Sequence, residues 1–218
     1  MKRFVVGLMV AAMATIGFGS VGAAAASSYW SVGYYTPSGR ALSMASTGTA
    51  GDAVAVFNFT NQPNTALLVT DNKGQNPSLL GGLTGESVSA SATVSGLTSS
   101  FNYYGEPSCG GTTANVRYFF ETSNAGGFAE TNYWWSNPVS APLTEGPVSL
   151  TPVLLDGANW SDFYGHFGND SAYSAGFNSA VSNVTMIGLS FGGGCGFENG
   201  VGTSDGSGTF TLNTFDVS

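Results

Sequence analysis

The 218-residue chain is poor in positive charge, with 5 Lys and Arg residues against 13 Asp and Glu residues and a net charge of −8. Lys2 and Arg3 are at the extreme N-terminus, and only Arg40, Lys73 and Arg117 follow them. Nucleic-acid binding requires a cluster of cations that displaces counterions from phosphates, and anionic membrane surfaces attract clusters of the same kind. Three scattered cations therefore argue against both partners, and they leave neutral ligands and divalent cations.

Histidine and cysteine are also scarce, with one histidine, His166, and two cysteines. A Ser-His-Asp triad would have to use His166, yet no G-x-S-x-G turn precedes a helix. Cys109 and Cys195 lie among glycines, and two distant cysteines in an oxidising compartment are expected to form one disulfide. A two-cysteine metal site is the alternative. Because no catalytic motif stands out, the sequence favours a protein without enzymatic activity.

Residues 1–26 have the three parts of a secretory signal peptide. Lys2 and Arg3 give the positive start, residues 4–18 are an apolar run, and residues 22–27 are small, as at a cleavage site. The apolar run is shorter than the ~20 residues of a membrane span, so a retained anchor is disfavoured. We expect cleavage after Ala26 and a bacterial protein that is secreted, extracellular or periplasmic or at the cell surface, with no membrane span in the mature chain.

The mature chain, residues 27–218, has a length typical of one domain, and residues 27–50 read as an irregular lead-in. Alternating polar and apolar residues predict short strands after that point. They are expected at residues 51–59, 65–70, 87–95, 115–122, 131–135, 148–155, 184–191 and 209–217. Turns rich in Gly, Asn and Ser separate them, which is typical of an all-β antiparallel sandwich or barrel.

Two local patterns refine this prediction. In the last strand Phe215 and Val217 have the opposite parity to Phe210 and Leu212, so either a β-bulge between them or burial of both faces of the strand is expected. Residues 174–182 are the one probable helical segment, in which Ala175, Ala180 and Val181 are expected to cover the sheet.

Three segments of the C-terminal half resemble a known family: residues 80–90 (LGGLTGESVSA), the turn Trp160-Ser161-Asp162, and the closing segment 206–217 (GSGTFTLNTFDV). They are similar to the jelly-roll sandwiches of secreted, galactose-binding-like carbohydrate-binding modules. The resemblance implies an antiparallel jelly-roll β-sandwich with at most one or two short helices. Such modules often hold a structural calcium through an Asp in the closing strand. Here Asn213 takes that place, so no cofactor is expected and calcium is only a weak candidate.

Other segments, 103–106, 132–135 and 192–195, resemble a group of bacterial secreted proteins to which no activity is attached.

Aromatic residues are the main candidates for ligand binding, because the C–H faces of sugars stack on aromatic rings. Trp134 and Trp135 are adjacent on a predicted strand, so their side chains point to opposite faces. One of them is expected in the core and the other at the solvent side or in a groove, although for any single Trp a role as a core filler is favoured over a role as a ligand platform. The predicted ligand-binding residues are Trp134, Trp135, Tyr104, Tyr133, Asn132, Glu121, Arg117 and Trp160.

Carboxylates leave two further hypotheses open. Glu121 and Glu130 lie on strands expected to be neighbours and could serve as the acid and nucleophile of a glycosidase, although a surface role is favoured. Asp156, Asp162, Asp170 and Asp205 are in loops suited to calcium but lack a dense D-x-D spacing. The sequence favours a non-catalytic protein that binds a polysaccharide or glycan. A structural or adhesive envelope or matrix protein without a small ligand comes next, and a glycoside hydrolase or lyase last.

Overall fold

The computed structural model describes residues 27–35, 42–61, 64–103, 113–123, 126–193, 200–204 and 206–218. The predicted signal peptide, Tyr104, and the predicted disulfide partners Cys109 and Cys195 lie outside these residues. Within the described ranges, none of the helices has the length and apolar character required to cross a bilayer.

Antiparallel strands make up most of the described chain. In order they are β1 (Ser27–Tyr35), β2 (Leu42–Gly48), β3 (Ala55–Phe59), β4 (Thr65–Thr70), β5 (Ser87–Ser95), β6 (Phe101–Tyr103), β7 (Asn115–Thr122), β8 (Tyr133–Ser136), β9 (Ala141–Pro142), β10 (Gly146–Ser149), β11 (Val153–Leu154), β12 (Trp160–Ser161), β13 (Val184–Gly192), β14 (Val201–Thr203) and β15 (Gly208–Val217). Short helices are η2 (Glu130–Asn132), η3 (Gly157–Asn159) and α1 (Ser174–Val181). The all-β antiparallel prediction is confirmed.

The strands form a 15-stranded hydrogen-bonded sheet with the main order β10-β5-β15-β3-β2-β1-β4-β13-β7-β8-β12. One residue pair, Gly48 with Val56, joins β2 to β3. The sheet therefore consists of two parts, a β5–β15 half (β10, β5, β15 and β3) and a β7–β13 half (β2, β1, β4, β13, β7, β8 and β12), which are almost separate in their hydrogen bonding. The jelly-roll connection pattern stays a prediction.

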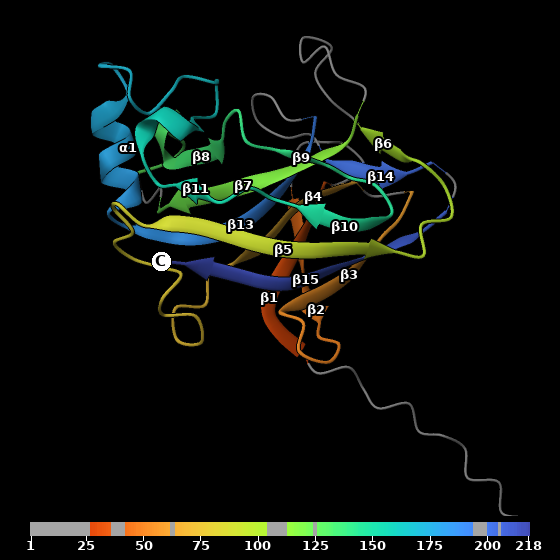
Figure 1. The fold of residues 1–218 in the computed structure, drawn as a ribbon. Coiled ribbons are helices and arrows are strands. Elements are labelled where there is room, and N and C mark those ends of the chain that lie inside the picture. The colour runs from red at the N-terminus through yellow and green to blue at the C-terminus, as the bar shows by residue number, and fades with distance from the viewer. Residues whose placement is uncertain are drawn as a thin grey trace, which may run out of the picture.

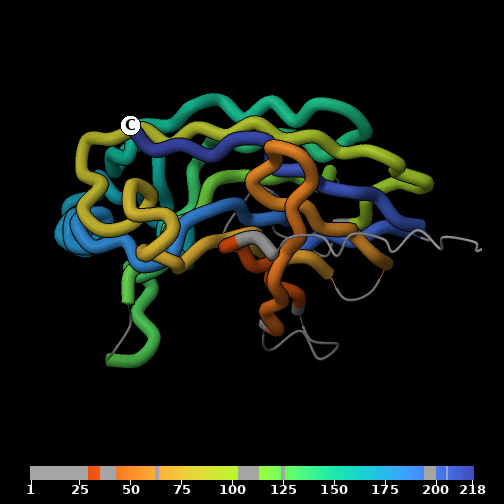
Figure 2. The backbone as a smooth tube through the Cα atoms, turned by 90° about the horizontal axis from the view of Figure 1, so that it is seen from below, coloured from red at the N-terminus to blue at the C-terminus, as the bar shows by residue number. Residues whose placement is uncertain are grey.

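Aromatic packing across the core holds the two halves face to face. Phe210 of β15 packs its ring edge-on against Phe191 of β13, with the ring centroids 5.3 Å apart. Trp30 of β1 contacts Phe215 of β15 in the same way at 5.1 Å. These strands are distant in the sheet order, so the sheet must fold over on itself. Figures 1 and 2 show the result, with β5 and β15 lying over β13 and β7.

The structure matches the predicted strand ranges 65–70, 87–95 and 115–122. The predicted strands 184–191 and 209–217 are each one residue longer, and the predicted strands 51–59 and 131–135 begin later, at Ala55 and Tyr133. The predicted bulge is confirmed, because the register of β15 against β5 shifts between Leu212 and Thr214 and brings Phe215 back into the core. The predicted strand 148–155 is divided into β10 and β11 around Pro152, which cannot donate to a ladder. Residues 27–50 were expected to be irregular, but they contain β1 and β2, paired with each other.

The predicted helix exists as α1 and lies at one end of the sheet, next to β8 (Figure 1). It buries Phe177, Ala180 and Val181, which lie within about one turn of each other on one face. Ala175 is exposed, so the expectation that it covers the sheet is wrong, and Phe177 takes that role. Phe177 packs edge-on against Trp134 at 5.0 Å, which fixes the helix beside β8.

Candidate functional site

The outer face of the β7–β13 half carries apolar side chains that lie apart from the main core. Along β7, residues 116, 118 and 120 lie in the main core, whereas Arg117, Phe119 and Glu121 have the opposite parity. Phe119 and Trp135 pack at a centroid distance of 5.1 Å on this outer side. Together with Ala66, Leu67 and Val69 they form a second apolar cluster, separate from the main core. A loop and further aromatic rings cover this outer cluster.

Those rings form a continuous group at the β8 end of the outer face, here named the aromatic strip: Phe128, Tyr133, Phe163 and Tyr164. Phe163 is central, with its centroid 5.1 Å from that of Phe128, 6.3 Å from Tyr133 and 5.2 Å from Tyr164. It also reaches Trp135 at 6.2 Å, which connects the strip to the outer cluster. The outermost rings, Phe128 and Tyr164, are 58% and 61% exposed. The strip therefore runs from buried to solvent-facing aromatic surface.

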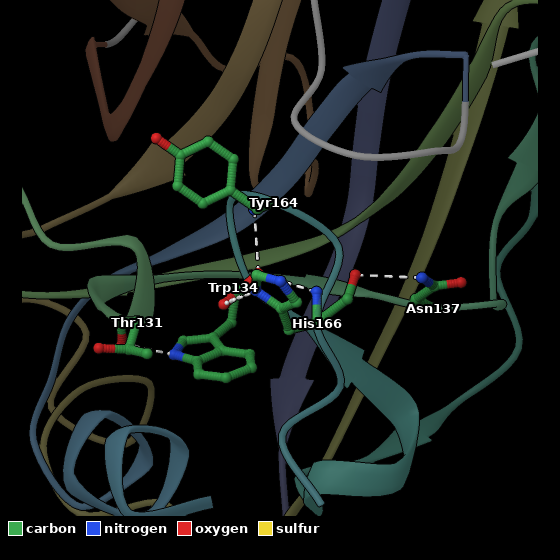
Figure 3. Close-up of polar contacts among 7 residues, drawn as sticks. Thr131, Trp134, Asn137, Tyr164 and His166 are labelled. Carbon is green, nitrogen blue, oxygen red and sulfur yellow. Dashed lines mark hydrogen bonds and ion pairs between the residues drawn. The ribbon is translucent and has the colours of Figure 1, made fainter. Parts of the chain in front are cut away.

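The strip is positioned by a tight loop that follows β12. The buried carboxylate of Asp162 accepts hydrogen bonds through Oδ1 from the backbone N–H groups of Tyr164 and His166, each at 2.9 Å. Gly165 completes the turn with a φ of 91°, a left-handed conformation that glycine adopts without strain. Figure 3 shows the ring of Tyr164 pointing away from His166 and from Trp134. The ring of Tyr164 therefore faces solvent, and the imidazole of His166 faces the protein.

His166 is held from two sides. Its Nδ1 lies 3.0 Å from Oδ2 of Asp162, and its ring stacks on Tyr173 with a centroid distance of 4.0 Å and an interplanar angle of 7°. Glu130 of η2 comes close to the same point. Desolvation raises the pKa of the Tyr173 hydroxyl, and the negative charges of Glu130, Asp162 and Asp170 raise it further. Carboxylates from three segments of the chain therefore surround one imidazole–phenol stack.

Four of the predicted ligand-binding side chains are buried, and their burial removes them from the candidate site. Trp134 and Trp160 are in the main core. Their indole Nε1 groups donate to the backbone oxygens of Thr131 (2.7 Å, drawn in Figure 3) and Leu154 (3.0 Å). A ring enclosed on both faces has no surface on which a sugar can stack.

Trp135 and Arg117 are also buried, on the outer side of the sheet. The two tryptophans do point to opposite faces, as predicted, but the surface expected around Trp135 is covered by the outer cluster. The indole Nε1 of Trp135 donates to Oγ of Ser190 at 3.0 Å, and Nη1 of Arg117 donates to the backbone oxygen of Ser136 at 3.4 Å. Both side chains stabilise the sheet from its outer face.

Three predicted residues stay accessible at or near the strip: Tyr133, Asn132 and Glu121, each of intermediate burial. Tyr133 lies opposite Glu121 in the β7–β8 ladder, so these two side chains are neighbours on one face. Desolvation raises the pKa of the Glu121 carboxyl to about 7. The candidate site therefore lies on the outer face beside β7 and β8, and it includes the predicted residue Tyr133. The predicted tryptophans do not belong to it, because they are buried.

Of the four rings of the strip, only Tyr133 is among the predicted ligand-binding residues; Phe128, Phe163 and Tyr164 are not. Phe128 follows the pair Gly126-Gly127 and Phe163 follows Asp162, so each is in a loop and belongs to no alternating segment. A large apolar side chain next to turn residues is a local signal of surface placement. No short sequence motif predicts that Glu130, Asp162 and His166 lie close together.

Comparison of the chain with protein-family models, with curated proteins and with solved structures finds no match.

Proposed function

We propose that this chain is a secreted, non-catalytic protein that binds an extracellular glycan on the aromatic strip. The observation that carries the proposal is the exposure of Phe128 and Tyr164 at the end of a connected group of aromatic rings. Isolated exposed apolar side chains are ordinary on protein surfaces, whereas contiguous apolar patches mark binding sites. Aromatic rings suit sugars because they offer an apolar face to the C–H groups of a pyranose.

Polar groups beside the strip support a carbohydrate over a purely apolar ligand. Glu130 and Asn132 are half-buried within four residues of Phe128 and Tyr133. His166 has a side chain that is 38% exposed, and its ring lies 6.3 Å from that of Tyr164. Sites for small polar ligands combine apolar rings with a few placed donors and acceptors of this kind. A carboxylate, an amide and an imidazole provide such groups for sugar hydroxyls.

The charge of the chain narrows the class of glycan. With a net charge of −8 and acidic groups at the strip, an anionic polysaccharide would be repelled. We therefore propose a neutral polysaccharide, bound on the exposed rings of the aromatic strip.

Affinity gel electrophoresis with a panel of neutral polysaccharides tests the proposal. We expect at least one polysaccharide to retard the wild-type protein, and Tyr164→Ala and Phe128→Ala to reduce that retardation by about tenfold in affinity each, which is the loss of one or two kcal/mol of ring contact. Both side chains are exposed, so these variants are expected to fold.

Tyr29→Ala is the matched control. Tyr29 is 54% exposed and belongs to β1, which β4, β13 and β7 separate from β8. Its loss is expected to leave retardation unchanged. Equal retardation of wild type and both strip variants, or retardation by no neutral polysaccharide in the panel, contradicts the proposal.

A further inference from the structure

The loop below the aromatic strip brings together three side chains that can bind a metal ion. Glu130, Asp162 and His166 each offer one ligand atom, and these atoms all lie within 4.8 Å of one another. They come from η2, from the turn after β12, and from the end of that turn. His166 is the only histidine in the sequence. Imidazole nitrogen with carboxylate oxygens is a donor set of divalent transition metals, above all Zn²⁺.

The geometry between Asp162 and His166 fits two ligands of one ion. Oδ1 of Asp162 is held by the backbone N–H groups of Tyr164 and His166, so the carboxylate has a fixed orientation. Oδ2 faces Nδ1 of His166 at 3.0 Å. Ligand atoms about 2.1 Å from a zinc ion lie roughly 3.0–3.5 Å apart at tetrahedral or square angles. The spacing that a hydrogen bond gives these two atoms is therefore close to the spacing that an ion requires.

Electrostatics and rigidity favour a cation at the same point. The ring of Tyr173 stacks on that of His166 with a centroid distance of 4.0 Å. The carboxylate of Asp162 is completely buried, so its charge is poorly screened by water. The stacked tyrosine limits rotation of the imidazole. Ligands that are held in place before binding lose little conformational entropy when the ion arrives.

We propose that Glu130, Asp162 and His166 bind one Zn²⁺-type divalent cation, with Glu130 Oε, Asp162 Oδ2 and His166 Nδ1 as the protein ligands and water completing the coordination. The ion replaces the proton between Nδ1 and Oδ2, and in the neutral imidazole that proton moves to Nε2. The three ligand atoms lie within 4.8 Å of one another, whereas ligands of one such ion are roughly 3.0–3.5 Å apart at tetrahedral or square angles, so the carboxylate of Glu130 moves closer by up to about 2 Å when the ion binds. The bound ion fastens η2 to the Asp162–His166 loop, and thereby the two ends of the aromatic strip.

Metal titration of the full chain, produced without a histidine tag and stripped with a chelator, tests the site. Calorimetry with ZnCl₂ is expected to show one ion per chain, and CoCl₂ is expected to give the visible absorption bands of a nitrogen- and oxygen-bound cobalt ion. Glu130→Gln and His166→Gln are each expected to weaken Zn²⁺ binding by about tenfold or more. Asp162 is not substituted, because its carboxylate also holds the loop together.

Asp170→Asn is the matched control, because Asp170 contributes charge near Tyr173 without belonging to the ligand cluster. Its removal is expected to change Zn²⁺ affinity by less than about threefold. The circular dichroism spectrum and melting temperature of each stripped variant verify folding.

The proposal is overturned if saturating Zn²⁺ gives neither heat nor a cobalt spectrum, if His166→Gln binds Zn²⁺ as tightly as wild type, or if Ca²⁺ competes equally with Zn²⁺, since calcium prefers oxygen ligands alone. These titrations contain no glycan, so their outcome is independent of the proposed function.

Discussion

The two outer faces of this sheet differ sharply although they belong to one fold. On the β5–β15 half, the outward residues are serines and threonines that pair across the strands, Thr211 with Thr93 and Thr214 with Ser91. The hydroxyls of Ser91 and Thr214 lie 2.8 Å apart and are exposed. On the β7–β13 half, the corresponding positions hold Phe119 and Trp135, which are buried under further rings.

This contrast shows that the fold does not require apolar residues on the outer face of the sheet. The serine and threonine face shows that a half-buried antiparallel sheet is stable with one hydrated side, which is the usual arrangement. The aromatic residues of the other face must therefore be explained by something besides sheet formation. The buried residues of the outer cluster are explained by packing under the Asp162–His166 loop. For the exposed rings of the aromatic strip, we propose ligand binding.

The largest effect is expected from Trp135→Ala, which tests whether the outer cluster acts as a second core. Trp135 is 5% exposed, and its indole donates to Ser190. Removing a buried Trp side chain typically destabilises a protein by about 3–5 kcal/mol, and we expect about 3 kcal/mol here. Urea unfolding followed by tryptophan fluorescence and circular dichroism measures it. A loss below about 1 kcal/mol would mean that the outer cluster adds little stability.

A smaller, pH-dependent effect is expected from Glu121→Gln. Burial raises the pKa of the folded-state carboxyl from 4.5 to about 7, so ionisation opposes folding. The stability present below pH 4.5 is lost as the pH rises through 7. The full shift corresponds to about 3 kcal/mol, which partial exposure reduces to about 1 kcal/mol.

We therefore expect Glu121→Gln to be neutral at pH 4 and more stable than wild type by about 1 kcal/mol at pH 8. Urea unfolding at the two pH values measures this difference. Glu145→Gln is a control on the β5–β15 half, where Glu145 accepts hydrogen bonds from the backbone N–H groups of Gly96 and Leu97. This second variant is expected to lose stability at pH 8, the opposite sign. A gain in both variants would point to net charge instead of burial.

The smallest effect is expected from Ser91→Ala on the hydrated face. The hydrogen bond to Thr214 is exposed, and surface substitutions of this kind usually change stability by within about 0.5 kcal/mol. The same unfolding measurement applies, and polysaccharide retardation should remain at the wild-type level. If Ser91→Ala abolished retardation, the binding face would have to be moved to the β5–β15 half.

Much of the fold could be predicted because strand alternation is a local signal. Residues 87–95 alternate Ser or Thr with Val or Ala, and the sequence alone gives both the strand and its buried face. The bulge near Asn213 is predictable for the same reason, since parity must change for Phe215 to reach the core. β1 and β2 were missed because their small and polar residues give no clear alternation. Their structure depends on pairing with each other and on the pairing of β1 with β4.

The candidate site was less predictable, because it depends on what covers each face. Adjacent residues on a strand must point to opposite sides, which is correct for Trp134 and Trp135, but no local rule reveals that Phe163 covers the second side. Glu130 and His166 are brought together by the β12 turn and η2, which are separated along the chain by strands β8 to β11. Only the three-dimensional structure brings such residues together.

The single pair between Gly48 and Val56 has a consequence for how this protein tolerates change. Since one main-chain pair contributes little, the relative placement of the two halves depends on interlocking rings such as Phe191 and Phe210. We therefore expect the exposed turn between β2 and β3, residues 50–52, to accept insertions more readily than the Phe191–Phe210 contact accepts a change of side-chain volume. Val54 lies outside this tolerant stretch, because its backbone N–H donates to the backbone oxygen of Leu212 at 2.8 Å.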